Sequence, residues 1–225
     1  MVQTASTYFD STATKYDDFA LRANPAYEAM LAEVERCLPE RAQHVLELGC
    51  GTGALTVRLV RRYPAADIVA VDGASEMLAI ARQRLEETQV SQVTLAVRSF
   101  EDLELADRSF DLIASNMSLH HVEEKVALYG RLRRALAPGG IFVLGDELLA
   151  EVPYMQQRNW DGWLDFARGN GVTEAKIAET ISHMERFDHY ESLPAQLALL
   201  QGAGFDPVDC VWRYQNYAVF VAQAA

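Results

Sequence analysis

The sequence predicts an α/β protein built on a doubly wound, mostly parallel sheet. Short apolar runs alternate with segments of helical periodicity, the pattern of a parallel sheet covered by helices. A glycine-rich turn over 49–53 follows one apolar run and opens a helix, and a second apolar run ends at Asp72. With 225 residues, the chain is long enough for one domain with a full core.

The core elements are expected in alternation along the chain. Strands are predicted near 44–48, 67–71, 93–98, 110–115 and 141–145. Helices are predicted near 54–62, 75–87, 123–137 and 194–202. Pro138-Gly139-Gly140 is expected to end a helix and to lead into the fifth strand. Two further strands near 207–214 and 216–223, joined tightly around Gln215 and Asn216, complete a seven-stranded sheet as an antiparallel hairpin.

Two segments lie outside this core of 44–145 and the closing elements of 194–225. The first is 1–43, with a helix expected near 25–38, and the second is an aromatic-rich helical insertion over 146–193. Ligand sites in open α/β sheets lie beyond the carboxyl ends of the strands. We therefore expect one domain in which both segments form a mobile lid over the site.

The residues around the first turn indicate a nucleoside-binding site. Glycines at 49, 51 and 53 let the backbone turn tightly and approach a ligand closely. Asp72, at the end of the second strand, can accept hydrogen bonds from both ribose hydroxyls. Plain turn glycines and a solvated strand-end acid are the structural alternatives.

A dinucleotide cofactor is the competing interpretation, since Gly49-x-Gly51-x-x-Ala54 fits the permissive fingerprint. Glu47 argues against it, because a carboxylate beside the turn suits a cationic amino acid better than a pyrophosphate. The chain also lacks a Tyr-x-x-x-Lys dyad and leaves little room for a substrate domain.

Four motifs in order resemble those of class I S-adenosylmethionine-dependent methyltransferases. They are V-L-E-L-G-C-G-T-G (45–53), V-D-G-A-S-E-M-L-A-I-A-R (71–82), F-D-L-I-A-S-N-M-S-L-H-H-V (110–122) and L-A-P-G-G-I-F-V-L (136–144). The resemblance implies a Rossmann-like fold with S-adenosyl-L-methionine as cofactor and S-adenosyl-L-homocysteine as product. It also implies methyl transfer to a small-molecule acceptor by direct in-line displacement.

The resemblance extends to individual cofactor-binding residues. Glu47 would hold the amino-acid portion, Asp72 the ribose, and Gly73 and Met77 the adenine, although Met77 also fits a helix core. Ser99 stands where relatives usually place an acid that accepts from the adenine amino group, so Glu101 or Asp102 would supply that acceptor. The full expected set is Glu47, Gly49, Cys50, Gly51, Gly53, Asp72, Gly73, Met77, Ser99, Phe100, Asn116, Met117, Tyr8 and Tyr16.

His120 and His121 are the candidate catalytic residues, because an imidazole can remove a proton from an acceptor. Structural hydrogen bonding of at least one ring is the alternative. Asp146 and Glu147 could hold a cationic substrate or serve as solvated charge. The expected substrate pocket comprises Phe19, Asp146, Glu147, Trp160, Trp163, His183 and Tyr214. His183 and His189 lack an organising spacing, so no metal site is predicted.

Charge and composition limit the partners. The formal net charge of −12 disfavours a nucleic-acid partner, and the arginine clusters at 58–62 and 131–134 are interpreted as solvated helix faces. Three cysteines without metal-type spacing, no secretory start and no membrane-length apolar run predict a cytoplasmic protein. A homodimer is left open. An RNA-modifying methyl or carboxymethyl transferase and a non-catalytic cofactor-binding protein remain the alternative functions.

Overall fold

A central sheet organises the computed structural model, which describes residues 4–88 and 93–225. Its strands run in the order β3-β2-β1-β4-β5-β8-β7. They are β1 (His44–Leu48), β2 (Asp67–Asp72), β3 (Val93–Val97), β4 (Phe110–Asn116), β5 (Leu136–Leu149), β7 (Phe205–Tyr214) and β8 (Tyr217–Ala224). β1 to β5 pair in parallel, whereas β8 is antiparallel to both β5 and β7. The predicted fold class is confirmed.

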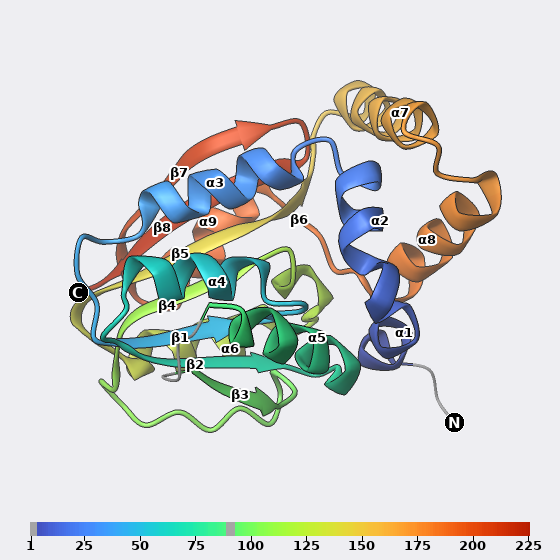
Figure 1. Cartoon of the computed structure of the whole chain (residues 1–225). Helices are drawn as coiled ribbons and strands as arrows, with labels where there is room; N and C mark the ends of the chain where they lie inside the picture. The colour runs from blue at the N-terminus through green and yellow to red at the C-terminus, as the bar shows by residue number, and fades with distance from the viewer. Residues whose placement is uncertain (1–3, 89–92) are drawn as a thin grey trace.

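Helices cover both faces of this sheet (Figure 1). One face carries α3 (Tyr27–Cys37), α4 (Ala54–Arg62) and α5 (Ser75–Glu86), and the other carries α6 (Lys125–Ala135) and α9 (Leu193–Gly202). Because β1 is covered on both sides, Val45, Leu46 and Leu48 are all fully buried, which explains its continuous apolar run. Each face of the sheet therefore has its own apolar cluster.

Helices from two distant parts of the chain gather beyond the carboxyl ends of β1 and β2 (Figure 1). They are α1 (Ala5–Thr12), the short η1 (Ala13–Lys15), α2 (Tyr16–Ala23), α7 (Pro153–Gly169) and α8 (Glu174–Phe187). The Arg22 guanidinium on α2 donates to the backbone carbonyls of Asn170 and Gly171, 2.9 and 2.5 Å away. These contacts tie the N-terminal segment to the insertion after β5.

The connection from α6 to β5 differs from its predicted form. α6 ends at Ala135, and Leu136 already pairs with Phe110 of β4. The register then shifts before Ile141 pairs with Leu112, so Pro138-Gly139-Gly140 lies inside the strand at an irregularity. Proline lacks a ladder donor and glycine tolerates unusual dihedrals, which is why this sequence makes a bulge here as readily as a helix stop.

The remaining boundaries agree closely with the prediction. The closing hairpin turns at Gln215, which has a left-handed φ of 51°, and Tyr214 pairs with Tyr217 across the turn. Three short elements were not predicted individually: η1 in the N-terminal segment, η2 (Leu119–His121) after β4 and β6 (Glu191–Ser192) beside β5. Within the described residues, every helix is too short or too polar to traverse a lipid bilayer.

Candidate functional site

A cavity of about 630 Å³ opens at the carboxyl edge of the sheet. Its floor comes from the turn after β1 and the ends of β2 and β4, and its walls from the segments after β3, from α1 and from the end of α8. The expected residues in its lining are Tyr16, Glu47, Gly49, Cys50, Gly51, Asp72, Gly73, Met77, Ser99, Phe100, Asn116, Met117 and His121. The motifs that follow separate strands thus meet in one space.

The glycine turn has a separate physical demand at each position. Gly49 has φ +64°, and a Cβ there would lie 1.9 Å from the hydroxyl oxygen of Ser118. Gly51 has φ +52° but would place a Cβ in open space, since no heavy atom of the described residues lies within 4 Å. Gly53 is outside the cavity lining, where a Cβ would come 3.1 Å from Cβ of Ala81 on α5. Packing requires glycine at 49, whereas the free space at 51 suits close approach of a ligand.

Asp72 is held by two backbone amides. One carboxylate oxygen accepts from the Gly51 N–H and the other from the Ala74 N–H, both at 2.8 Å. Burial raises the pKa of Asp72 above its ordinary value, while the same amides oppose the rise. Each carboxylate oxygen has a second lone pair, so the oriented group can still accept from ribose hydroxyls.

Glu47 is a buried carboxyl group that lacks a full set of partners. Its side chain lies in β1, the residue is 1% exposed, and its Oε2 atom has no hydrogen-bond partner within 4–88 and 93–225. Burial, opposed in part by Thr56 and reinforced by the Asp72 charge, raises the pKa of Glu47 to about 8. An unsatisfied acid of this kind in a cavity wall is suited to a cationic ligand.

The segment after β3 offers neutral and charged groups to the cavity. The Ser99 hydroxyl donates to the Asp102 carboxylate at 3.0 Å and accepts from the Asp102 N–H at 3.2 Å. Ser99, Phe100 and Glu101 line the cavity together with Arg98, whereas Asp102 is outside the described lining and serves as the hydrogen-bond partner of Ser99. Across the cavity, the side-chain oxygen of Asn116 is buried without a hydrogen-bond partner in the described part of the chain.

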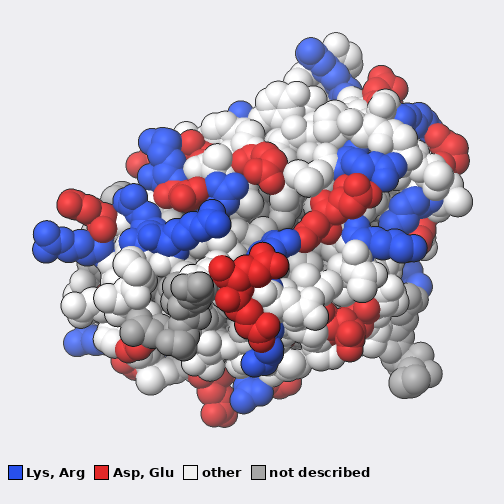
Figure 2. All heavy atoms as spheres, viewed as in Figure 1, with Lys and Arg blue, Asp and Glu red and all other residues white. Residues whose placement is uncertain are grey.

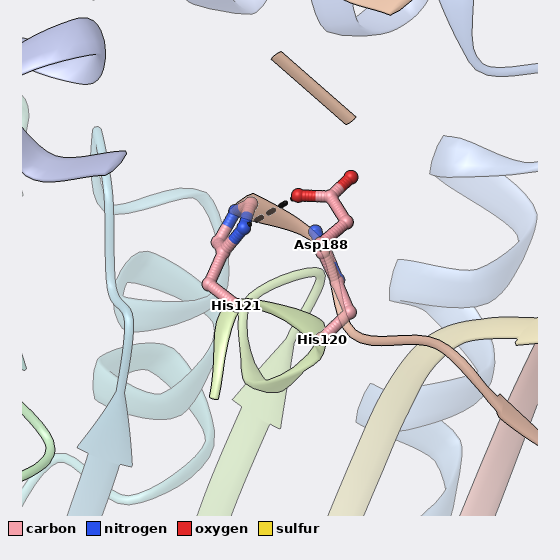
Figure 3. A group of neighbouring side chains, drawn as sticks. All are labelled: His120, His121 and Asp188. Carbon is pink, nitrogen blue, oxygen red and sulfur yellow. Dashed lines mark ion pairs between the residues drawn. The ribbon is translucent and has the colours of Figure 1, made fainter. Parts of the chain in front are cut away.

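A histidine cluster lies at the edge of the cavity (Figure 3). Nδ1 of His120 lies 2.5 Å from Oδ1 of the buried Asp146, and Nδ1 of His121 lies 2.8 Å from Oδ1 of Asp188. His121 lines the cavity, whereas His120 lies behind it. Of the two predicted catalytic histidines, His121 is the one positioned to meet a ligand.

The rings of this cluster differ in charge. Burial opposes protonation of His120, but the Asp146 carboxylate outweighs it and raises the pKa of His120 to about 9. Burial lowers the pKa of His121 and lowers that of His183 to about 4, so burial favours the neutral form of both rings. Burial raises the pKa of Glu147 to about 7.

The residues expected in the substrate pocket divide between two places. Asp146, Glu147 and His183 belong to the polar region around the histidines, where His183 stacks on Tyr8 with ring centroids 4.1 Å apart. Phe19, Trp160 and Trp163 instead pack together in the apolar cluster between α2, α7 and α8. Tyr214 is 46% exposed and stacks on Trp212 of β7. None of these seven side chains is in the described cavity lining, nor is Tyr8, whose hydroxyl accepts from Lys176 at 3.1 Å.

The structure adds cavity residues that the motifs did not indicate. They come from the N-terminal segment and from the end of α8, and include Thr4, Ser6, Phe9, Arg186, Phe187 and His189. Asp17 ties the N-terminal segment to the core, because it accepts from the Thr52 hydroxyl at 2.5 Å and pairs with Arg84 of α5. Amphipathic helices of this kind carry no cofactor pattern that a sequence search could find.

Charge is mixed on the face of the molecule shown in Figure 2. Lys and Arg side chains are interleaved there with Asp and Glu. A polyanion would meet carboxylates wherever it met a cation on this face.

Comparison with known proteins gives consistent relatives. A family profile described as a methyltransferase domain matches residues 45–140. The chain is 31% identical over 224 residues to a carboxy-S-adenosyl-L-methionine synthase of Stutzerimonas stutzeri, covering 95% of this chain and 90% of the relative. A Shewanella loihica protein of the same name is 28% identical over 223 residues, covering 95% and 90%.

A solved structure shares the fold over nearly its whole length. An S-adenosylmethionine-dependent methyltransferase from Thermotoga maritima superimposes with a TM-score of 0.66 at 19% identity, covering 98% of this chain and 99% of that one. Identity this low supports the likeness of fold alone.

Proposed function

This chain belongs to the class I S-adenosylmethionine-dependent methyltransferases, and on that premise we propose that it methylates a small-molecule acceptor by direct in-line displacement. The observation that carries the proposal is the pairing of two acids in one cavity wall. Asp72 is oriented by backbone amides, and Glu47 is buried with an oxygen that lacks a partner among the described residues. A ribose with two hydroxyls and an amino-acid tail with a cationic amine would satisfy both.

The lining residues would share the work of binding and positioning. When bound, the cofactor supplies a methyl group already activated by a sulfonium. The glycine turn would receive the nucleoside, and Asn116 and Met117 would line the space beside the methyl group. Holding the acceptor atom about 3 Å away and in line with the S–CH₃ bond can remove roughly 7–11 kcal/mol from the barrier. Positioning is therefore the main task of this cavity.

We take four lining residues as the candidates for the acceptor side, because they come from α1, η2 and the end of α8 with the residues that follow it, and not from the glycine turn or the end of β2. They are Phe9, His121, Phe187 and His189. A cavity of about 630 Å³ is within the size range of small-molecule sites. We infer that the N-terminal segment and α8 close this side, which the Asp17 contacts to Thr52 and Arg84 support.

Synthesis of carboxy-S-adenosyl-L-methionine is the second candidate, since relatives of that name align over 95% of the chain. A carboxylate on the sulfonium methyl carbon is an anion that calls for a nearby cation. Among the described lining residues, Arg98 and Arg186 carry that charge. This chemistry would need a carboxyl donor and removal of a proton from the methyl group.

Two measurements test these proposals in sequence. Calorimetry with S-adenosyl-L-homocysteine and with NAD first tests the cofactor class, and failure to bind the former would overturn both candidates. Methyl-labelled cofactor is then offered to amines, thiols, phenols and carboxylic acids. Label in an acceptor with formation of S-adenosyl-L-homocysteine supports methyl transfer. A cofactor that instead gains the mass of a carboxyl group supports the synthase.

Variants at the acceptor side refine the first candidate. His121→Ala is expected to lower methyl transfer while the affinity for S-adenosyl-L-homocysteine stays close to that of the wild type, because the ribose and the amine are assigned to Asp72 and Glu47 and not to His121. Equal turnover by both proteins would remove His121 from the acceptor side.

A further inference from the structure

Three of the five histidines of this chain, His120, His121 and His183, gather around the Asp188 carboxylate. One ring nitrogen each of His120 and His121 and a carboxylate oxygen of Asp188 lie within 4.8 Å of one another. Figure 3 shows the three side chains pointing toward a common centre. His183 adds a ring nitrogen 3.9 Å from the same Asp188 oxygen. His189 follows Asp188 directly and lines the cavity.

The polar atoms at this centre are buried and poorly satisfied. The side chains of His183 and Asp188 are only 7% and 3% exposed. Among the described residues, both ring nitrogens of His183 lack a hydrogen-bond partner, and Nδ1 of His121 and Oδ1 of Asp188 lack a well-directed one although they lie 2.8 Å apart. Buried polar atoms are nearly always paired, so four together indicate an absent partner.

The surrounding residues already orient the donors. Nδ1 of His120 lies 2.5 Å from Oδ1 of Asp146, which leaves the other ring nitrogen to face the centre. The same Asp146 oxygen accepts a hydrogen bond from the Glu147 N–H at 2.9 Å, so this carboxylate is itself held in place. The Tyr190 hydroxyl donates to Oδ2 of Asp188 at 2.5 Å, which leaves Oδ1 facing the histidines. A carboxylate behind a ligating imidazole is the usual support of a protein metal site.

We propose that His120, His121 and Asp188 bind a divalent first-row transition-metal ion, zinc or iron(II), with His183 as a fourth ligand. Imidazole with one carboxylate suits these ions, whereas magnesium and calcium prefer oxygen ligands alone. Ligand bonds of about 2.0–2.2 Å place two donors roughly 3–3.5 Å apart. The wider spacings of the cluster, up to 4.8 Å, would therefore contract, and the 2.8 Å spacing between Nδ1 of His121 and Oδ1 of Asp188 would open slightly.

The ion would face the acceptor side of the cavity, because His121 belongs to both the cluster and the cavity wall. A fifth coordination position there would anchor an oxygen or nitrogen atom of the acceptor. That role rests on the proposed function, whereas metal binding itself does not.

The test uses the full chain after treatment with a chelator. We expect one Zn²⁺ ion per chain by calorimetry, and visible ligand-field absorption on addition of Co²⁺ that Zn²⁺ then abolishes. His121→Ala and Asp188→Asn should each weaken Zn²⁺ binding at least tenfold, and so should Asp146→Asn, which removes the support behind His120. His44→Ala is the matched control, since that histidine lies at the start of β1 beside Asp67.

Wild-type protein that takes up no stoichiometric Zn²⁺ or Co²⁺ would overturn the metal site, and so would unchanged affinity in His121→Ala and Asp188→Asn. Circular dichroism monitors the folding of each variant. If one of the other variants unfolds, His183→Gln still tests the site, because its Co²⁺ spectrum should differ from that of the wild type. Binding of S-adenosyl-L-homocysteine to the metal-free chain is measured in parallel. If S-adenosyl-L-homocysteine does not bind, the proposed function is wrong, and the uptake of metal still decides whether the metal site exists.

Discussion

The carboxylate of Asp72 accepts a hydrogen bond at 2.8 Å from the backbone N–H of Gly51. The acid at the end of β2 thereby fixes the conformation of the turn after β1. A residue expected to bind the ribose is also part of the turn that would receive the rest of the nucleoside. Cofactor affinity and local stability should therefore respond together to changes at this position.

Asp72→Asn is predicted to lower the affinity for S-adenosyl-L-homocysteine by roughly tenfold to a hundredfold, the equivalent of one charge-assisted hydrogen bond of about 1.5–3 kcal/mol. An amide has one acceptor oxygen, so its NH₂ group must face the Gly51 or the Ala74 N–H. Calorimetry measures the affinity. Asp67→Asn, on the exposed first residue of the same strand, should behave like wild type. Equal losses in both variants would contradict this account.

Glu47→Gln should abolish a proton release that accompanies cofactor binding. With a pKa of about 8, Glu47 is mostly protonated at pH 7 in the free protein, and a cationic amine beside it would drive ionisation. Calorimetry in two buffers of different ionisation enthalpy should give close to one proton released per S-adenosyl-L-homocysteine for wild type and none for the variant. The same release from both proteins would place the ionising group elsewhere.

The same carboxyl group should make stability depend on pH. Its pKa rises from 4.5 to about 8 on folding, so the folded chain keeps a proton that the unfolded chain releases. The corresponding stabilisation is fully present below pH 4.5 and is lost as the pH rises through 8. Urea unfolding across this range and above it should show that Glu47→Gln gains stability relative to wild type as the pH rises from 4.5 to about 8, and that the difference is constant at higher pH. A constant difference would contradict the shifted pKa.

Alanine at two neighbouring glycines should separate packing from ligand approach. Gly49→Ala combines a left-handed φ with a Cβ 1.9 Å from the Ser118 hydroxyl, so we expect about 2–5 kcal/mol of lost stability. Gly51→Ala meets no described neighbour and should cost about 1–2 kcal/mol for its φ alone. Its Cβ would nevertheless occupy the cavity wall and weaken S-adenosyl-L-homocysteine binding. Denaturant unfolding and calorimetry measure the two effects, and equal stabilities would refute the packing argument.

Asp17→Asn tests the closing role proposed for the N-terminal segment. The carboxylate accepts from Thr52 at 2.5 Å and pairs with Arg84, so its neutralisation should loosen the segment over the cavity. We expect about 1 kcal/mol of lost affinity for S-adenosyl-L-homocysteine, or roughly fivefold, mainly through a faster off-rate. Asp18→Asn is the control, because Asp18 pairs only at the surface with Arg22 among the described contacts. Stopped-flow release rates that match in both variants would reject the closing role.

Local sequence determined the side of the cavity that is formed by the glycine turn over 49–53 and Asp72. A buried strand, a turn with glycine at 49, 51 and 53 and a following helix are encoded within about twenty residues, because dihedral preference and burial act locally. Parallel pairing of β1 with β2 then places Asp72 beside the same turn. The positions of Glu47 and Asp72 beside this turn could thus be predicted from the order of residues along the chain, and their roles in cofactor binding stay predictions.

Only the tertiary structure decided the other side of the cavity. Asp188 meets His121 across 67 positions of sequence, and Phe9 and Phe187 reach the cavity from helices whose apolar faces could equally have formed core. Trp160 and Trp163 did so, packing between helices and outside the cavity. An amphipathic pattern specifies that a face is buried but not what buries it, so the partners of these helices depend on packing.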